Sequence, residues 1–242
     1  MVRKEDYDKA VAEFIKNLRE ELGEHIKAIY VAGSYARGDF VPGRSDIDIY
    51  IVLDKRDLSI ENKINEIAQR IEEKYLKEVE YYHQAPFSVT ITSIEEIKSG
   101  RSWLGLGWEY YIFKKEGVLL YGEDIRSIIP EPSREAITTL VKNFIEKSVP
   151  TRGQLINQCF SLIFRSASIF LSLKGKYFAS KKKVVEEFEK EYGDCNITRM
   201  LKEAYDLWVT WSKRDLSDSE FAKLGLLAAR ICEELKQMLE NI

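Results

Sequence analysis

The chain has 242 residues, of which 32% are charged and 45% hydrophobic, and its formal net charge is −3 at pH 7. These values are typical of a soluble globular protein with enough residues for one large domain or two smaller ones. The slightly acidic balance excludes a general electrostatic attraction to nucleic acid or to an anionic membrane, although a local basic patch remains open.

Cysteine usage and the N-terminal residues indicate the cellular compartment. The three cysteines, Cys159, Cys195 and Cys232, are widely spaced and form no C-x-x-C pair, so we expect reduced thiols rather than disulfides or a zinc site. The N-terminal residues lack the apolar stretch of a signal peptide, and no run approaches the length that spans a bilayer. We therefore expect a cytoplasmic protein with no membrane partner.

The first half of the chain alternates predicted helices and strands. Apolar residues at helical spacing predict a helix over residues 5–22 and a second amphipathic helix over 57–76. Ser93 and Glu96 have the spacing of a capping box, which predicts a further helix start. Short hydrophobic runs predict four strands, over residues 27–32, 47–53, 87–93 and 117–122.

The second half of the chain is helical in its periodicity. Pro130 and Pro132 mark the change in character. We therefore expect two domains, residues 1–127 with an α+β fold around a small sheet and residues 128–242 with an all-helical bundle. Helical periodicity predicts five helices, over roughly 134–148, 152–173, 180–192, 196–213 and 218–240.

Two carboxylates stand out in the second predicted strand. Asp46 and Asp48 are two positions apart, so their side chains point to the same face, with Cα atoms about 7 Å apart. Bare carboxylates that close repel each other, and a divalent cation between them removes the repulsion. Oxygen ligands suit Mg²⁺, which prefers few protein ligands together with substrate phosphates. The open alternative is a solvent-facing strand with ordinary polar alternation.

The first strand meanwhile ends at Gly33 and Ser34, where a helix is expected to begin. Free backbone N–H groups at a helix start, a hydroxyl and a glycine that permits close approach can together hold phosphate. One segment would therefore hold phosphate while the neighbouring strand holds metal. This combination indicates metal-assisted phosphoryl or nucleotidyl transfer.

The same residues resemble the signature of the DNA polymerase β-like nucleotidyltransferase superfamily. Gly33-Ser34, eleven further residues and then Asp46-Ile47-Asp48 match its core motif, and residues 35–38 and Ser45 match its extended forms G-S-x-A-R-G and S-D-x-D. The resemblance implies an α/β-type core with a small mixed sheet. It also implies that Asp46 and Asp48 bind Mg²⁺ and that Gly33 and Ser34 hold the triphosphate of ATP or another nucleotide.

Two residues of the extended motif have alternative interpretations. Arg37 and Ser45 could contact the nucleotide, which is how the resemblance assigns them. Arg37 could instead simply cover the helix start. Ser45 could instead cap the turn before the strand.

Residues 160–188 are similar to the helical domain of bacterial aminoglycoside adenylyltransferases that modify streptomycin and spectinomycin. In those enzymes an Arg and a Lys of the second domain reach ATP. Arg165 and Lys181 match these positions, which implies that nucleotide and acceptor are held between the two domains. The alternatives are a structural salt bridge for Arg165 and a solvated face for Lys181, which precedes two further lysines.

The chain departs from the adenylyltransferase pattern in the third predicted strand. The family places there a Glu that serves as third carboxylate and base, whereas this chain has Ser88. A hydroxyl of ordinary acidity neither binds Mg²⁺ strongly nor removes a proton at neutral pH. Glu80, Glu109 or His83 could substitute if the fold brings one of them near. The acidic residue that grips the antibiotic also has no clear match.

These features lead to two principal hypotheses. The first is a nucleotidyltransferase that moves a nucleoside monophosphate, AMP from ATP, to a hydroxyl of a small molecule or protein and releases pyrophosphate. The second is a nucleotide-binding regulatory protein with weak or lost catalysis, which Ser88 keeps open. An antitoxin-like role beside a helical ribonuclease is a third interpretation. The acidic chain, without a recognisable RNA-binding module, argues against a nucleic-acid partner.

Overall fold

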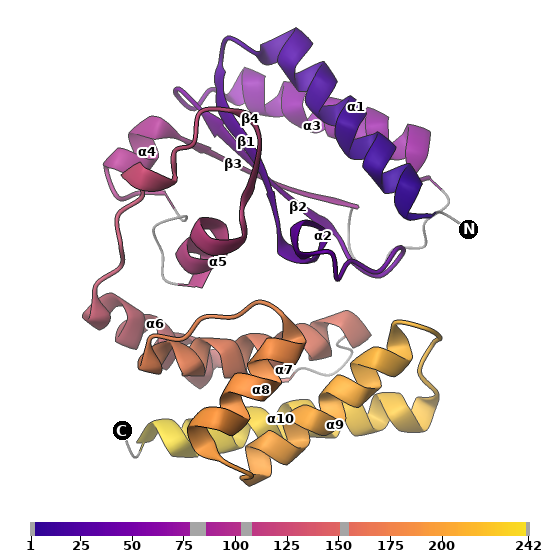
Figure 1. Ribbon diagram of the computed structural model, residues 1–242, viewed down its shortest axis with the longest axis vertical. Helices are drawn as coiled ribbons and strands as arrows, with labels where there is room; N and C mark the ends of the chain where they lie inside the picture. The colour runs from indigo at the N-terminus through magenta and orange to yellow at the C-terminus, as the bar shows by residue number, and fades with distance from the viewer. Residues whose placement is uncertain (1–2, 78–85, 103–107, 151–154, 241–242) are drawn as a thin grey trace. The chain divides into compact units, whose positions relative to one another are not determined.

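The computed structural model describes residues 3–77, 86–102, 108–150 and 155–240. The chain divides into two compact units, Met1–Pro132 and Ser133–Ile242, with the division a few residues after the boundary expected from the sequence. The first unit contains a β-sheet with helices, and the second unit is helical (Figure 1). This arrangement confirms the predicted fold class.

The sheet of the first unit has four strands in the order β3-β2-β1-β4. The central pair β1–β2 and the pair β1–β4 are antiparallel, whereas β2 and β3 are parallel, so the sheet is mixed. The predicted strands over 47–53 and 87–93 coincide with β2 and β3. The strands are β1 (Ile26–Ala32), β2 (Ile47–Leu53), β3 (Phe87–Ser93) and β4 (Val118–Gly122).

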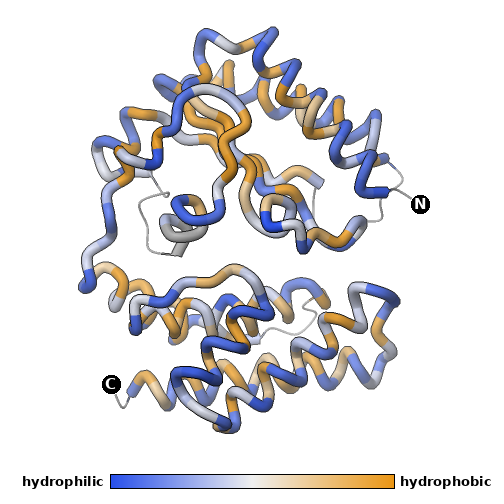
Figure 2. Tube along the Cα trace, in the orientation of Figure 1, coloured by the Kyte–Doolittle hydropathy of each residue, from blue (hydrophilic) through white to orange (hydrophobic). Residues whose placement is uncertain are grey.

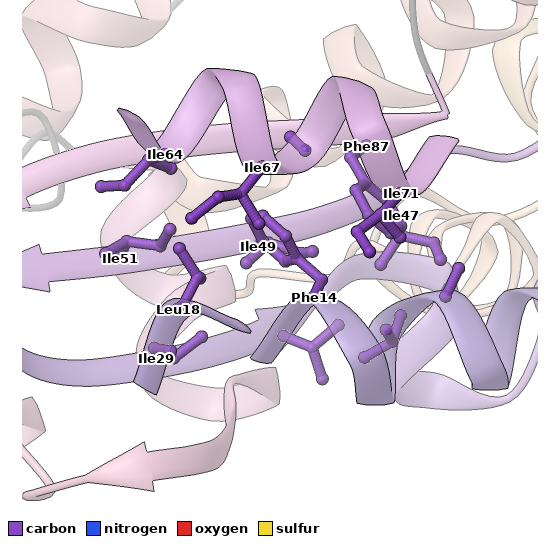
Figure 3. Packing of buried hydrophobic residues seen from close by; sticks show 14 of the residues in the cluster. Phe14, Leu18, Ile29, Ile47, Ile49, Ile51, Ile64, Ile67, Ile71 and Phe87 are labelled. Atoms are coloured by element: carbon purple, nitrogen blue, oxygen red, sulfur yellow. The ribbon is translucent and has the colours of Figure 1, made fainter. Parts of the chain in front are cut away.

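Two helices, α1 (Lys4–Leu22) and α3 (Leu58–Tyr75), lie side by side over one face of this sheet (Figure 1). The hydrophobic colouring follows the central strands (Figure 2), and nearly all of their residues are buried. Ile29 of β1 and Ile47, Ile49 and Ile51 of β2 meet the two helices and are fully buried. Burying an apolar side chain of this size stabilises the fold by about 1.5–3 kcal/mol. Figure 3 shows this core, with Ile29, Ile49 and Ile51 of the sheet, Phe14 and Leu18 of α1, and Ile64 and Ile67 of α3.

Even-numbered residues of the same strands point to the opposite face, where α5 (Trp108–Glu116) lies. Phe113 of α5 is fully buried, with its ring centroid 4.7 Å from that of Tyr30 and 5.4 Å from that of Tyr50. Periodicity predicts no helix in this segment, because apolar and aromatic residues follow one another almost without interruption from 108 to 113. This helix is therefore an addition to the predicted fold.

Short helices follow two of the strands. The helix α2 (Gly33–Arg37) begins directly after β1, and α4 (Ile94–Lys98) directly after β3. The capping box of α4 is present as predicted, since the Ser93 hydroxyl accepts from the backbone N–H of Glu96 and the Glu96 carboxylate accepts from the backbone N–H of Ser93.

Within the described residues, the second unit contains the five predicted α-helices, with ends that differ from the expected ones by a few residues. The helix α7 is the most buried of them within the described residues, and it packs against each of the other four. The helices are α6 (Arg134–Lys147), α7 (Ile156–Leu171), α8 (Lys181–Tyr192), α9 (Asn196–Trp211) and α10 (Asp218–Glu240).

The expectation that no run is long enough to cross a bilayer is wrong, because one helix has the necessary length and apolar composition. The stretch Ile156–Lys174, which is α7 with the turn that follows, is long and apolar enough to pass that test. However, 67% of it is buried inside the helical unit, as is usual for the core helix of a bundle.

A half-buried carboxylate fixes the start of β3. Glu72 of α3 accepts a hydrogen bond of 2.7 Å from the backbone N–H of Phe87, and burial raises the pKa of Glu72 above its ordinary value of 4.5. A carboxyl with a raised pKa binds more protons in the folded than in the unfolded state, so stability falls as pH rises above 4.5 through the folded pKa.

We therefore expect Glu72→Gln, which keeps the acceptor but cannot ionise, to flatten this pH dependence. The wild-type contribution is at most about 1.4 kcal/mol per pH unit. Urea unfolding of both proteins, from about pH 4.5 to about pH 7.5, measures how the free energy of unfolding depends on pH. Parallel pH profiles for the two proteins would contradict the expectation.

Candidate active site

The turn between β1 and α2 lies directly against the carboxylate of Asp48. Gly33 has φ of +66°, and a Cβ atom built on it would lie only 1.9 Å from Oδ2 of Asp48. A side chain at position 33 would thus be strained by its backbone conformation and would also displace the carboxylate. The sequence-predicted phosphate segment and the sequence-predicted metal residue are therefore in contact.

The helix α2 is a single turn that begins at Gly33 and is closed by Gly38 in the left-handed conformation. Ala32 provides no side-chain cap at its start, so the first backbone N–H groups can donate to an anion. Ser34 is the second residue of this turn and is half-buried. The Tyr35 hydroxyl, whose pKa burial raises, anchors the turn to α1 by donating to Asp8 at 2.6 Å.

Asp48 occupies the middle of a row of three residues across the sheet. Its register partners are Ala32 on β1 and Ser88 on β3, both of them small residues. Asp46 precedes β2 by one position and, like Asp48, is half-buried. In the described part of the chain there is no group of three or more His, Cys, Asp or Glu side chains suited to hold a metal. The arrangement thus offers two carboxylates, a donor set that fits Mg²⁺ when phosphate oxygens complete its shell.

The loop that joins α2 to β2 is held by the first helix. Tyr7 of α1 is fully buried, and its hydroxyl accepts a hydrogen bond of 2.9 Å from the backbone N–H of Gly43. The ring of Tyr7 also meets that of Phe40 edge-on at 4.7 Å. Ser45 is buried, and its hydroxyl accepts from the backbone N–H of Val41 at 3.2 Å. Ser45 therefore has the turn-capping role that the sequence left open, and its nucleotide contact stays a prediction.

Arg37 is engaged in ion pairs within the first unit. Its guanidinium lies 2.7 Å from Glu116 at the end of α5 and 3.2 Å from Asp39. Glu116 is not singled out by any sequence pattern, because it follows two lysines in a charged run and only the tertiary fold brings it to Arg37.

Arg165 and Lys181 lie in the second unit, on α7 and at the first position of α8. The Arg165 guanidinium is 5.6 Å from the centroid of the Phe144 ring. The Lys181 ammonium is 3.9 Å from the centroid of the Trp208 ring, a close cation–π contact. Lys181 is therefore not simply one member of a solvated lysine face.

The structure does not describe the side chains that could replace the missing third carboxylate. Glu80 and His83 lie outside the described residues, and the side chain of Glu109 is not described either. Ser88 itself is half-buried and stands beside Asp48, as the strand register requires. The departure from the adenylyltransferase pattern is thus located at the carboxylate pair.

Replacing Gly33 by Ala should separate the effect of this contact from ordinary backbone strain. We expect Gly33→Ala to lose about 1–2 kcal/mol of stability from its left-handed conformation and also to lose at least tenfold in Mg²⁺-dependent ATP affinity. Gly100 is the matched control, because it has φ of +69° and no atom within 4 Å of the added Cβ. Chemical unfolding and calorimetry should show that Gly100→Ala loses stability but not ATP affinity. Equal affinity losses in both variants would refute the role of the contact.

Three similarities to known proteins agree with this site. Residues 11–103 match the family model of the nucleotidyltransferase domain, a range that includes Gly33, Ser34, Asp46, Asp48 and Ser88. A stretch of 47 residues is 49% identical to the candidate protein adenylyltransferase MJ0604 of Methanocaldococcus jannaschii. That match covers 19% of this chain and 46% of the relative, so the chain spans less than half of the relative's length.

A solved structure shares the fold of nearly the whole chain. It is the crystal structure of spectinomycin adenyltransferase AAD(9) from Enterococcus faecialis with ATP and spectinomycin. The similarity has a TM-score of 0.64 and covers 94% of this chain and 98% of the other, at 16% sequence identity. The family match, the shared fold and the contact between the glycine turn and the carboxylate strand lead to one conclusion. Over residues 11–103 the first unit is similar to a nucleotidyltransferase domain, and the chain has the fold of the spectinomycin adenyltransferase.

Proposed function

We propose that the chain is a magnesium-dependent nucleotidyltransferase that moves AMP from ATP to a hydroxyl of a small molecule or protein. The observation that carries the proposal is the contact of Gly33 with Asp48, which joins a phosphate-binding turn to a pair of carboxylates. The names of the two similar proteins, a protein adenylyltransferase and an antibiotic adenyltransferase with bound ATP, support ATP as the donor.

In this proposal each residue of the site has a defined task. Asp46 and Asp48 would hold Mg²⁺, which neutralises charge on the phosphates as pyrophosphate leaves. The backbone N–H groups at the start of α2 and the Ser34 hydroxyl would hold the triphosphate. The acceptor hydroxyl would release its proton to solvent as its oxygen bonds to the α-phosphorus, the bond from that phosphorus to the bridging oxygen would break, and pyrophosphate would depart. ATP contacts by Arg165 and Lys181 stay predictions.

The second candidate is a nucleotide-binding regulator without turnover. Ser88 favours it, because it stands beside Asp48 where the related adenylyltransferases are expected to carry a base. General-base assistance contributes about 10²–10⁴-fold to a transfer rate, so its loss slows catalysis without preventing nucleotide binding.

One experiment separates the two candidates. The chain is incubated with Mg²⁺ and ATP labelled in its α-phosphate, together with soluble proteins in one sample and a panel of small hydroxyl compounds in another. We expect Mg²⁺-dependent transfer of the label in one sample, with an equal amount of pyrophosphate released. Tight ATP binding without transfer in either sample would favour the regulator. Absence of Mg²⁺-dependent ATP binding would overturn both.

A further inference from the structure

The side chain of Arg37 shares a helix face with the phosphate-binding turn. Arg37 is the last residue of α2 and follows Ser34 by three positions and Gly33 by four. Residues with these spacings are neighbours on a helix surface, and helical side chains lean toward the N-terminus. This spacing places Arg37 on the same face of α2 as Gly33 and Ser34, and its guanidinium pairs with Glu116 and Asp39.

Glu116 determines where that guanidinium lies. Its Oε2 accepts from Nη1 of Arg37 at 2.7 Å, and the two side chains are 21% and 18% exposed. Asp39 is the looser partner, at 3.2 Å and 49% exposed. A pair that is mostly removed from water is stronger and less screened than an exposed one. The buried ring of Phe113, one helical turn before Glu116, fixes the end of α5 against the sheet.

The contact with Glu116 leaves Arg37 incompletely satisfied. The Nε atom of Arg37 is buried and has no hydrogen-bond partner among the described residues. An unpaired buried donor is costly, so the guanidinium is held in this position against a penalty.

We propose that Glu116 is a positioning residue for Arg37. It holds the Arg37 guanidinium toward the α2 turn, and its negative charge partly neutralises the guanidinium until a nucleoside triphosphate binds. The proposal rests on the proposed function, because the triphosphate is the ligand that Arg37 would meet. Glu116 acts only through Arg37, and it has two separable effects. It anchors the Arg37 guanidinium in position, and it reduces the attraction of that guanidinium for a triphosphate.

The two effects predict opposite results for two substitutions. Glu116→Gln keeps an acceptor for Nη1 but removes the negative charge, so MgATP affinity should rise by roughly three- to tenfold. Glu116→Ala removes the anchor and lets Arg37 turn toward solvent, so affinity should fall by a similar factor. A merely structural role of Glu116 would lower affinity in both variants. Calorimetric titration with MgATP measures both changes.

Two further variants complete the test. In an Arg37→Ala background, Glu116→Gln should no longer raise MgATP affinity, because its effect passes through Arg37. Glu95→Gln is the control for the loss of one carboxylate, since Glu95 of α4 forms an exposed ion pair with Arg101 at 3.3 Å, and it should leave affinity unchanged. The Gln variants alone decide the question if Glu116→Ala fails to fold.

The outcomes distinguish failure of the role of Glu116 from failure of the proposed function. An affinity that is unchanged or reduced in Glu116→Gln, while the wild-type chain binds MgATP, would overturn the role of Glu116 and leave the proposed function intact. A wild-type chain that does not bind MgATP would overturn both.

Discussion

The double variant Asp46→Asn, Asp48→Asn should bind ATP equally well with Mg²⁺ and with a chelator, and its transfer rate should fall at least about a hundredfold. Both side chains are half-buried, and Asp48 lies against the turn at Gly33. Asparagine preserves their size and one oxygen of each group but removes the negative charge that attracts a divalent cation. Removing the charges also relieves their mutual repulsion.

Calorimetry with and without Mg²⁺ checks this expectation, and Asp54→Asn is the control. Asp54 follows the last residue of β2, at the other end of the strand that begins beside Asp46, and pairs with Lys27 at 3.6 Å on the surface. Its substitution should leave Mg²⁺-dependent affinity unchanged. Retention of that affinity in the double variant would remove the basis of the proposed function.

The second large effect is a gain of activity on Ser88→Asp. Position 88 is in register with Asp48 on the neighbouring parallel strand, so the new carboxylate would point to the same face as the pair. With the metal bound, three carboxylates can share its charge, and the added one can accept a proton from the acceptor. We expect a rise within the range of about 10²–10⁴-fold that general-base assistance supplies.

Initial rates of pyrophosphate release against pH measure this gain. A new dependence on a single ionisation should appear in Ser88→Asp, because only the ionised form can take the proton. Ser88→Asn is the matched control, having the same size but no basic group, and should show neither the gain nor the ionisation. A Ser88→Asp variant that binds MgATP as wild type does but transfers no faster would show that the base already comes from elsewhere.

Local sequence predicts the elements of this fold well and its tertiary contacts poorly. The strands β2 and β3 are predicted to the residue, because each is a short β-branched run between clear breaks. The helix α5 is absent from the prediction, because residues 108–113 show no helical period. Its placement depends on Phe113 meeting Tyr30 and Tyr50, a contact between distant parts of the sequence.

In the candidate site, too, the local sequence predicts some features, whereas others depend on the tertiary fold. The common face of Asp46 and Asp48 follows from strand alternation, and the positions of Gly33 and Ser34 follow from the motif. The approach of Gly33 to Asp48 depends on how β1 and β2 are registered, which alternation alone does not determine. The engagement of Arg37 by Glu116 depends on α5, so no local pattern indicates it.

Ser88, beside Asp48, also affects how fast different acceptors would react in the proposed transfer. Where no protein group removes the proton, the ease with which the acceptor ionises by itself controls the rate. A phenol such as tyrosine, with a pKa of about 10, gives up its proton far more readily than a sugar or serine alcohol. Across a series of nucleophiles, a wild-type chain without its own base should therefore discriminate by acidity more steeply than an enzyme equipped with one.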